Sequence, residues 1–302
     1  MNQEFYSNGK LLLSGEYAVL DGALAWAIPT TYGQYLRVSS NMTKLLSWRS
    51  LDEKGNIWFE GVYTLVNLEE ISSSDQNISR GIQNILQNAK LLNPSFLTET
   101  NGYAIETALS FPKNWGLGSS STLINNVAQW ATINAHTLLD VTFGGSGYDI
   151  SCAQYDVPIL YTIKNKAHIV TALHESLPFV DSLYFVYLNQ KKNSRDGIST
   201  YRKRNIKTDE LVSQITELTK KMVASSSLEE FEVLMVTHEK ILSKALNIPT
   251  VKSKLFSDFS GEVKSLGAWG GDFILVTGRE NTPDYFKKKG YPIIVPFQEM
   301  IL

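Results

Sequence analysis

The sequence predicts an α+β protein of two lobes, and two observations carry that prediction. The chain has 302 residues, more than a single hydrophobic core usually takes, so two lobes are expected. Residues up to about Ser50 read as strands interrupted by turns, whereas long amphipathic helices follow Tyr201. We therefore expect an N-terminal lobe over residues 1–170 and a C-terminal lobe over residues 171–302.

Apolar residues at alternating and at helical spacing predict the strands and helices of the first lobe. Ile82, Ile85 and Leu86 recur on one helix face, which indicates a helix over residues 79–92. The polar segment 72–75 before that helix reads as a loop. The expected strands cover residues 32–40, 103–110, 159–163 and 168–172, and a further helix covers residues 123–135.

The second lobe is predicted to contain two long helices, a glycine loop and short strands. Ser227 and Glu230 have the spacing of a capping box, which opens a helix that runs to about Leu246. His238 lies near the apolar stripe of this helix, so we interpret it as a core or boundary histidine. The other expected elements are helices over residues 208–224 and 283–289, and strands over residues 183–188, 273–277 and 293–295.

The segment from Pro112 to Thr122 is the most informative stretch, because it joins a strand to a helix through glycines and hydroxyls. The first amides of a helix have no internal partner and carry partial positive charge, so an anion is their natural occupant. Gly116 and Gly118 allow the backbone to approach an oxygen closely. The segment predicts a phosphate-binding loop, against the alternative of an ordinary turn with a serine cap.

Two other segments combine glycine with apolar strands. Near the start of the sequence, Lys10 heads an apolar run that ends at Gly15 and Glu16. Towards its end, a glycine-rich run over residues 266–272 precedes the apolar strand at 273–277. Three separate glycine-bearing segments need one explanation.

Together these segments resemble the three motifs of the GHMP kinases, the superfamily of galactokinase, homoserine kinase, mevalonate kinase and phosphomevalonate kinase. Thr122 stands where alanine is usual in the second motif. Trp269 replaces the middle glycine of the third motif, where a bulky ring would narrow the space beside a substrate or nucleotide. The matching residues are Gly9, Lys10, Gly15 and Glu16 in the first motif, Pro112, Gly116, Leu117, Gly118, Ser119 and Ser120 in the second, and Gly267, Ala268, Gly270 and Gly271 in the third.

A fourth segment, residues 143–153, resembles the Gly-Ser-Gly-x-Asp stretch that carries the catalytic aspartate in the mevalonate and phosphomevalonate kinase branch. By this resemblance Asp149 is the catalytic candidate. From spacing alone, Asp149 can equally cap the helix that follows it. The glutamate that related mevalonate kinases add to the metal site has no convincing equivalent, since residues 135–143 offer only Asp140.

The resemblance implies an ATP-dependent kinase of a small molecule, with ATP and Mg²⁺ as cofactors and mevalonate or phosphomevalonate as the expected substrate. Asp149 would orient or deprotonate the acceptor, Lys10 would stabilise charge beside it, and Ser120 would hold the metal. The nucleotide-binding residues would be Pro112, Gly116, Leu117, Gly118, Ser119, Ser120, Ser121 and Thr122, and the substrate-binding residues Glu16, Gly147, Tyr148, Arg195, Gly267, Ala268, Trp269 and Gly270.

Three readings stay open at this point. An ATP-dependent diphosphomevalonate decarboxylase would use the same nucleotide loop with a differently placed aspartate. A GHMP-fold protein that binds a ligand without turnover would account for Trp269 and for the missing carboxylate. The basic loop 191–195, which contains Arg195, would bind a carboxylate or phosphate unless it is simply solvated.

Composition and charge narrow the class of protein. The net charge is −2, so no nucleic-acid-binding surface is expected and anions must be bound by local groups. Cys152, the single cysteine, cannot form an internal disulfide, and no segment reads as a signal peptide or membrane span, which predicts a cytoplasmic protein. By resemblance, the lobes are of the ribosomal protein S5 domain 2 type and the ferredoxin-like type, and a homodimer is allowed.

Motifs of other enzyme classes are missing from the sequence. Lys10 is followed by leucine, and the earlier glycine of a Walker A loop is absent. Neither glycine loop continues to the third glycine of a dinucleotide fingerprint. Tyr148 occupies the last glycine position of a Gly-x-Ser-x-Gly hydrolase elbow, and no clustered Cys/His set suggests zinc.

Overall fold

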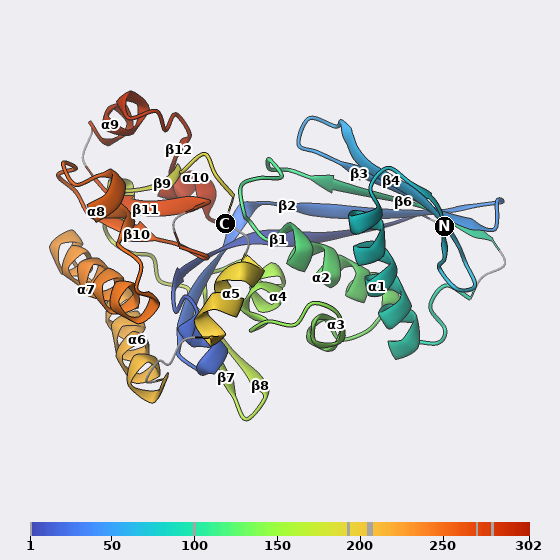
Figure 1. The fold of residues 1–302 in the computed structure, drawn as a ribbon, viewed down its shortest axis with the longest axis horizontal. Coiled ribbons are helices and arrows are strands. Elements are labelled where there is room, and N and C mark those ends of the chain that lie inside the picture. The colour runs from blue at the N-terminus through green and yellow to red at the C-terminus, as the bar shows by residue number, and fades with distance from the viewer. Residues whose placement is uncertain (1, 99–100, 192–193, 204–207, 270, 279–280) are drawn as a thin grey trace. The chain divides into compact units, whose positions relative to one another are not determined.

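The structure is a computed structural model that describes residues 2–98, 101–191, 194–203, 208–269, 271–278 and 281–302 (Figure 1). The chain forms two compact units from interleaved segments, which differs from the predicted single boundary after residue 170. Long strands cause the difference, because β1 (Asn2–Ser14) and β2 (Ala25–Asn41) each supply residues to both units. The first unit contains Met1–Gly9, Tyr32–Lys113 and Leu117–Gln154, and the second contains Lys10–Thr31, Asn114–Gly116 and Tyr155–Leu302.

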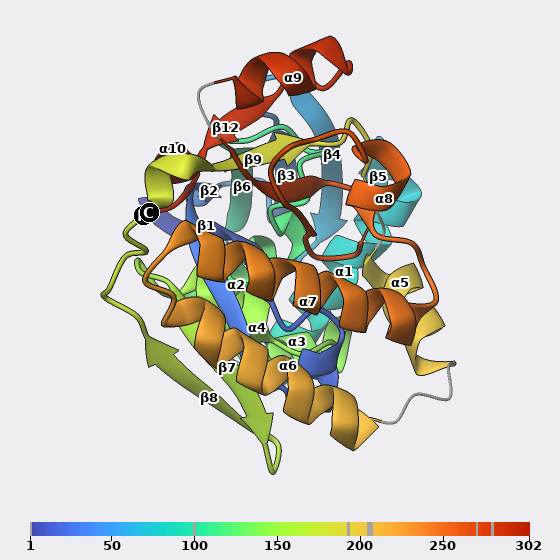
Figure 2. The same ribbon diagram turned by 90° about the vertical axis from the view of Figure 1, so that its left-hand side faces the viewer.

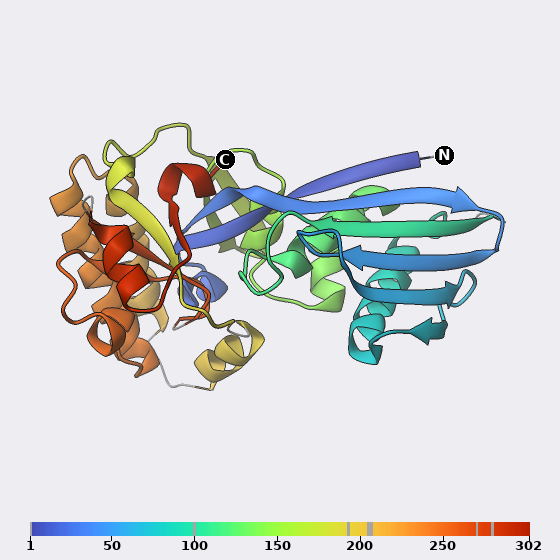
Figure 3. The same ribbon diagram turned by 90° about the horizontal axis from the view of Figure 1, so that it is seen from above.

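A mixed sheet forms one layer of the first unit. Its strand order is β5-β4-β3-β6-β2, with β1 beside β2, and Figure 3 shows β6, in green, between two blue strands. Neighbours along this order are antiparallel except β3 and β6, which run parallel. The strands not yet given are β3 (Leu45–Leu51), β4 (Ile57–Thr64), β5 (Glu70–Ser73) and β6 (Gly102–Leu109).

Helices form the other layer of the first unit, and a buried apolar core lies between helices and sheet. Leu36, Leu46 and Ile105 contribute to this core from the strands, while Ile85 and Val127 contribute from the helices. Figure 1 shows α1, α2 and α3 beside one another, and α2 packs against α1, α3 and α4. The helices are α1 (Gln76–Leu92), α2 (Ser119–Ala131), α3 (Ala135–Thr142) and α4 (Tyr148–Ala153).

The second unit contains a four-stranded antiparallel sheet in the order β10-β11-β9-β12. Its strands are β9 (Leu183–Tyr187), β10 (Val263–Ser265), β11 (Phe273–Thr277) and β12 (Ile294–Pro296). Figure 2 shows α6 and α7 lying side by side, and these two helices pack against each other. The helices are η1 (Ala18–Asp21), η2 (Val180–Ser182), α5 (Ser194–Arg202), α6 (Thr208–Val223), α7 (Leu228–Leu246), α8 (Val251–Leu255), α9 (Thr282–Lys288) and α10 (Phe297–Met300).

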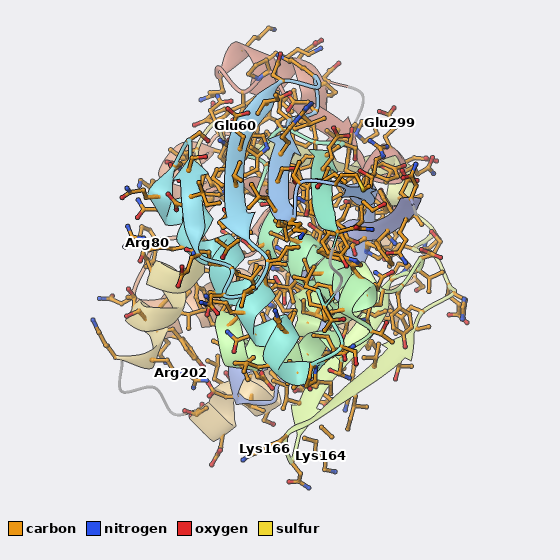
Figure 4. The ribbon with its side chains drawn as sticks, turned by 90° about the vertical axis from the view of Figure 1, so that its right-hand side faces the viewer. Glu60, Arg80, Lys164, Lys166, Arg202 and Glu299 are labelled. Carbon is orange, nitrogen blue, oxygen red and sulfur yellow. The ribbon has the colours of Figure 1, made fainter. Side chains whose placement is uncertain are left out.

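A hairpin of β7 (Ile159–Lys164) and β8 (Ala167–Ala172) completes the second unit, where β7 pairs with the start of β2. Figure 4 shows Lys164 and Lys166 at its tip. Asn165 and Lys166 have φ angles of 52° and 64°, the left-handed pair that a two-residue hairpin turn requires. In the described part of the chain, no helix combines the length and apolar character needed to cross a membrane.

Most predicted elements are confirmed, and three differ. The helix expected over residues 123–135 instead spans Ser119–Ala131, with Gly118 as its N-cap residue and Thr132 as its C-cap residue. The segment 72–75, expected as a loop, begins with the last two residues of β5. The basic stretch after β9 was expected as a loop, yet α5 begins within it.

Candidate active site

The predicted phosphate loop ends where α2 begins. Gly118 is the N-cap residue, and its φ of 88° lies in the left-handed region that favours glycine. The first bond inside the helix runs from the Thr122 amide to the Gly118 carbonyl oxygen, over 3.0 Å. The amides from Gly118 to Ser121 are therefore the ones that the helix itself leaves without a partner, at its positive end.

Two hydroxyl side chains of this turn are used inside the protein. The Ser121 hydroxyl donates to the Gly118 carbonyl oxygen at 2.8 Å, and the Thr122 hydroxyl donates to Gln34 Oε1 at 2.7 Å. Both side chains are buried. Because the amide and the hydroxyl of Thr122 are both occupied, the expectation that Thr122 contacts the nucleotide needs correction. Ser121 keeps only its amide for that role.

The other two hydroxyls of the turn are available. Ser119 is half-buried and Ser120 is exposed. Neither hydroxyl has a hydrogen-bond partner within the part of the chain that the structure describes. These serines could therefore bind a phosphate oxygen or a metal ion, as the sequence predicted for them.

The helix that carries Asp149 begins in the same way as α2. Its N-cap is Gly147, with a φ of 79°, and no side chain caps it. Asp149 lies one residue inside α4, so the alternative that Asp149 caps this helix is wrong. Its half-buried carboxylate has no hydrogen-bond or ion-pair partner among the described residues. Tyr148, the first residue of α4, is likewise half-buried.

Lys10 lies at the glycine loop, in the second unit. Its ammonium group donates to the carbonyl oxygen of Gly116 over 3.3 Å. Gly116 has a φ of 69°, and a side chain there would overlap the carboxylate of Asp272, which lies against it. A cation and an acid thus flank Gly116. Since Asp149 belongs to the first unit, the predicted pairing of Lys10 with Asp149 stays a prediction.

Two aromatic residues of the second unit fix the preceding part of the loop. Trp115 is buried and meets Phe273 of β11 edge-on, with ring centroids 5.2 Å apart. The Tyr187 hydroxyl donates to the Asn114 carbonyl oxygen over 3.1 Å. Burial, together with the negative charge of Asp272, raises the pKa of Tyr187 and so keeps it a donor.

The first motif leads into a cluster of ionisable side chains that are fully buried. Glu16 forms an ion pair with Lys264 of β10, and its other oxygen lies 3.2 Å from Nε2 of His238 in α7. Burial alone would raise the pKa of Glu16, but Lys264 and His238 hold it below its ordinary value. Burial and Lys264 lower the pKa of His238 against the opposing effect of Glu16, which favours the neutral form of its ring. Glu16 is thus enclosed in the second unit, which corrects its predicted role as a substrate contact.

Glu239 extends this cluster along α7. Its carboxyl group accepts hydrogen bonds from the amide of Ser265 at 3.1 Å and from the Ser265 hydroxyl at 2.9 Å. Burial raises the pKa of Glu239 to about 8, against the opposing effect of Lys264. The cluster joins the first motif to β10, the strand that leads into the third motif. His238 is a core histidine, as predicted.

The third motif is open beside its first glycine. A side chain at Gly267 would meet no atom of the described residues within 4 Å. Trp269 is buried among residues of α5, α6 and α7 such as Tyr201, Leu211 and Leu242, so its ring fills the helical core of the second unit. The expectation that this ring narrows the space beside a ligand stays a prediction. Ala268 is half-buried.

The predicted site residues fall into three groups. The first unit holds Pro112, Leu117, Gly118, Ser119, Ser120, Ser121, Thr122, Gly147, Tyr148 and Asp149. The second unit holds Lys10, Glu16, Gly116, Gly267, Ala268 and Trp269. Gly270 and the side chain of Arg195 lie outside the described residues.

A surface cavity of about 530 Å³ lies elsewhere, on the first unit. Strands β1, β2, β3 and β6 line it, and none of the predicted site residues does. Arg37 in this cavity forms ion pairs with Glu4 at 2.6 Å and Glu106 at 3.3 Å. Arg49 also lines the cavity, so its two basic and two acidic side chains balance in charge.

Solved structures resemble this chain, although no family model and no curated protein sequence matches it. Mevalonate kinase of Methanococcus jannaschii is 18% identical, with a TM-score of 0.71 over 96% of this chain and 94% of that one. Phosphomevalonate kinase of Streptococcus pneumoniae, in complex with phosphomevalonate and AMPPNP, is 16% identical, with a TM-score of 0.67 over 95% of each chain. Galactokinase of Lactococcus lactis, complexed with galactose, is 13% identical, with a TM-score of 0.67 over 97% and 92%.

These neighbours are kinases of small molecules, and the shared architecture defines the class of the fold. The chain has the GHMP kinase fold, as its glycine motifs predicted. Within that fold, the solved neighbours include mevalonate, phosphomevalonate and sugar kinases.

Proposed function

We propose that this protein is an ATP-dependent kinase of a small molecule. The observation that carries the proposal is the N-terminus of α2, where a left-handed Gly118 precedes amides that the helix leaves unpaired. Ser119 and Ser120 add hydroxyls at the same turn. A phosphate chain fits this donor set, because helix N-termini bind anions through amides and dipole together. When bound, ATP supplies the γ-phosphoryl group and Mg²⁺ neutralises charge between its phosphates.

In this proposal each site residue has a separate role. The amides from Gly118 to Ser121 hold the phosphates, and Ser120 is the hydroxyl we assign to the metal. Asp149, whose carboxylate is not used as a helix cap, orients the acceptor hydroxyl or takes its proton. Lys10 provides positive charge at the glycine loop. Phosphoryl transfer needs mainly this positioning and charge stabilisation.

Mevalonate or phosphomevalonate is the acceptor we propose, because the segment around Asp149 resembles that branch of the superfamily. We retain the cytoplasmic location, the homodimer and the two named lobe types as predictions. The ring of Trp269 packs in the helical core, so it gives little support to a non-catalytic role. The decarboxylase reading differs from the kinase in its products, so one assay can separate them.

The test is a turnover screen with MgATP against mevalonate, phosphomevalonate, diphosphomevalonate, homoserine and hexoses. We expect ADP and a phosphorylated product from one acceptor, and a rate about 10²–10⁴-fold lower for Asp149→Asn. Asp140→Asn, an exposed acid on α3, is the matched control and should keep the wild-type rate. ADP with free phosphate and carbon dioxide would show a decarboxylase, and no turnover with any acceptor would overturn the proposal.

A further inference from the structure

A line of hydrogen-bonded polar residues runs through the first unit, from Gln154 through Asn125, Ser7 and Asn126 to Gln34. We propose that this line positions α4, and with it Asp149, relative to the phosphate-binding turn. The inference rests on the proposed function for its catalytic meaning, but its structural part stands on hydrogen bonds alone. Asn125 and Asn126 of α2 are its central members.

The line is continuous and has one direction. Gln154 Nε2 donates to Asn125 Oδ1 at 2.8 Å, and Asn125 Nδ2 donates to the Ser7 hydroxyl at 2.8 Å. The Ser7 hydroxyl donates to Asn126 Oδ1 at 2.7 Å, and Asn126 Nδ2 donates to the Gln34 carbonyl oxygen at 2.9 Å. Each asparagine uses its oxygen as acceptor and its nitrogen as donor. Rotating either side-chain amide by half a turn would therefore place a donor against a donor or an acceptor against an acceptor.

The central members are out of contact with solvent. Ser7 and Asn125 are 1% exposed, and Asn126 is 0% exposed. Asparagine is a poor helix former, and its burial is unfavourable unless its polar atoms are paired. Apolar residues at these positions would serve a core equally well, as Ile124 and Val127 do on either side. The two asparagines therefore fix the relative orientation of the residues that they bond, in addition to filling the core.

The two ends of the line lie at the two parts of the proposed site. At one end, the side chain of Gln34 accepts the hydrogen bond from Thr122, which ends the first turn of α2. At the other end, Gln154 is the C-cap residue of α4. Asp149 lies five residues before Gln154, about 7.5 Å along a helix axis. A tilt of α4 would thus move Asp149 with respect to the unpaired amides of α2.

The experiment removes the hydrogen bond from Gln154 to Asn125, because Gln154 is exposed and its substitution is the least harmful to folding. Gln154→Leu abolishes the donor to Asn125, while Gln154→Lys keeps a donor and serves as the conservative rescue. Asn93→Leu is the matched control. Asn93 Nδ2 donates to the carbonyl oxygen of Ala131 at 2.7 Å, and Ala131 is the last residue of α2, far from Asn125 and α4 along that helix. Hydrogen exchange of amides 151–154, the dissociation constant of Mg-AMPPNP and kcat are measured for each variant.

In Gln154→Leu we expect exchange in α4 to quicken about tenfold and kcat to fall about tenfold, the effect of one lost hydrogen bond that is partly buried. The dissociation constant of Mg-AMPPNP should stay within a factor of about three, because the amides of α2 are untouched. Gln154→Lys should restore exchange and kcat. Asn93→Leu should lower stability and leave both unchanged.

Two results would overturn the inference. Unchanged exchange in α4 of Gln154→Leu would show that the line does not hold this helix. An equal loss of kcat in Gln154→Leu and Asn93→Leu would reduce the line to general stability. If the wild-type protein phosphorylates no acceptor, the proposed function fails, while the exchange measurement still decides whether the line positions α4.

Discussion

The ammonium group of Lys10 donates a hydrogen bond to the carbonyl oxygen of Gly116, over 3.3 Å. This contact joins the first motif to the glycine loop, two residues before the left-handed Gly118. In the proposed function, a lysine held there would supply fixed positive charge to a bound phosphate chain. Such a charge accelerates a reaction when its attraction to the substrate becomes stronger as negative charge develops in the transition state.

Lys10→Met should lower kcat about 10²–10³-fold, the usual cost of removing one preorganised electrostatic group. The apolar side chain keeps most of the packing volume, so the variant should fold. Lys90→Met is the matched control, because Lys90 likewise donates to carbonyl oxygens, those of Leu65 and Val66. Steady-state kinetics of both variants check the prediction, which fails if the two lose activity equally.

Gly118→Val should weaken nucleotide binding as well as stability. Its φ of 88° disfavours any residue with a β-carbon by about 1–2 kcal/mol, and a side chain there would intrude on the phosphate-binding turn. Gly55→Val separates the two effects, since Gly55 has a φ of 81° in an open turn where an added side chain would meet none of the described atoms within 4 Å.

Thermal unfolding and titration with Mg-AMPPNP are the measurements for this pair of variants. We expect comparable losses of stability, but a raised dissociation constant only for Gly118→Val. Wild-type affinity in a folded Gly118→Val protein would argue against phosphate binding at α2.

The ion pair of Glu16 and Lys264 predicts a strong effect on stability. Glu16→Leu leaves Lys264 buried without its partner, which typically costs about 3–5 kcal/mol. The double variant Glu16→Leu/Lys264→Met should regain most of that loss, because apolar residues can replace a buried pair. Urea unfolding measures both. A stable Glu16→Leu protein that only binds its substrate poorly would restore the role first predicted for Glu16.

The start of α2 was predictable from sequence because its signals are local. Glycines, serines and the apolar periodicity that follows them lie within about a dozen residues, so a helix start at this segment could be inferred, although the periodicity placed its first residue at 123 instead of Ser119. The same holds for α7, where Ser227 accepts a hydrogen bond from the Glu230 amide at 3.2 Å. In the structure, the Glu230 carboxylate accepts from the neighbouring Ser226 amide, a small departure from the expected box.

The buried cluster was not predictable in the same way, because its members are far apart along the chain. Glu16 and Lys264 are 248 positions apart, and no periodicity links them. One signal was present, since Lys264 interrupts a short strand that is otherwise apolar or small. Asn125 and Asn126 gave a similar signal inside an apolar helix. A polar residue at a core position indicates a partner without identifying it.

Trp269 and Asp272 show why the third motif was only partly understood from sequence. A glycine motif fixes where a loop occurs, but the direction of a substituted side chain depends on neighbours from other elements. The ring of Trp269 joins a core formed with α6 and α7. Asp272 directly follows the glycine run, and its position against Gly116 emerged only from the fold.

The raised pKa of Glu239 predicts a specific dependence of stability on pH. In the folded protein burial raises this pKa to about 8, whereas the ordinary value is 4.5. Between these values the folded state keeps a proton that the unfolded chain releases, so the free energy of unfolding falls as pH rises, by up to about 1.4 kcal/mol per pH unit. The stabilisation from this group is complete below about pH 4.5 and is lost as pH rises through about 8. Glu239→Gln should remove that slope from urea unfolding curves recorded between pH 5 and 8, while Glu229→Gln, an exposed acid on the same helix, should keep it. A slope that persists in Glu239→Gln would show that this carboxyl group does not retain its proton in the folded state.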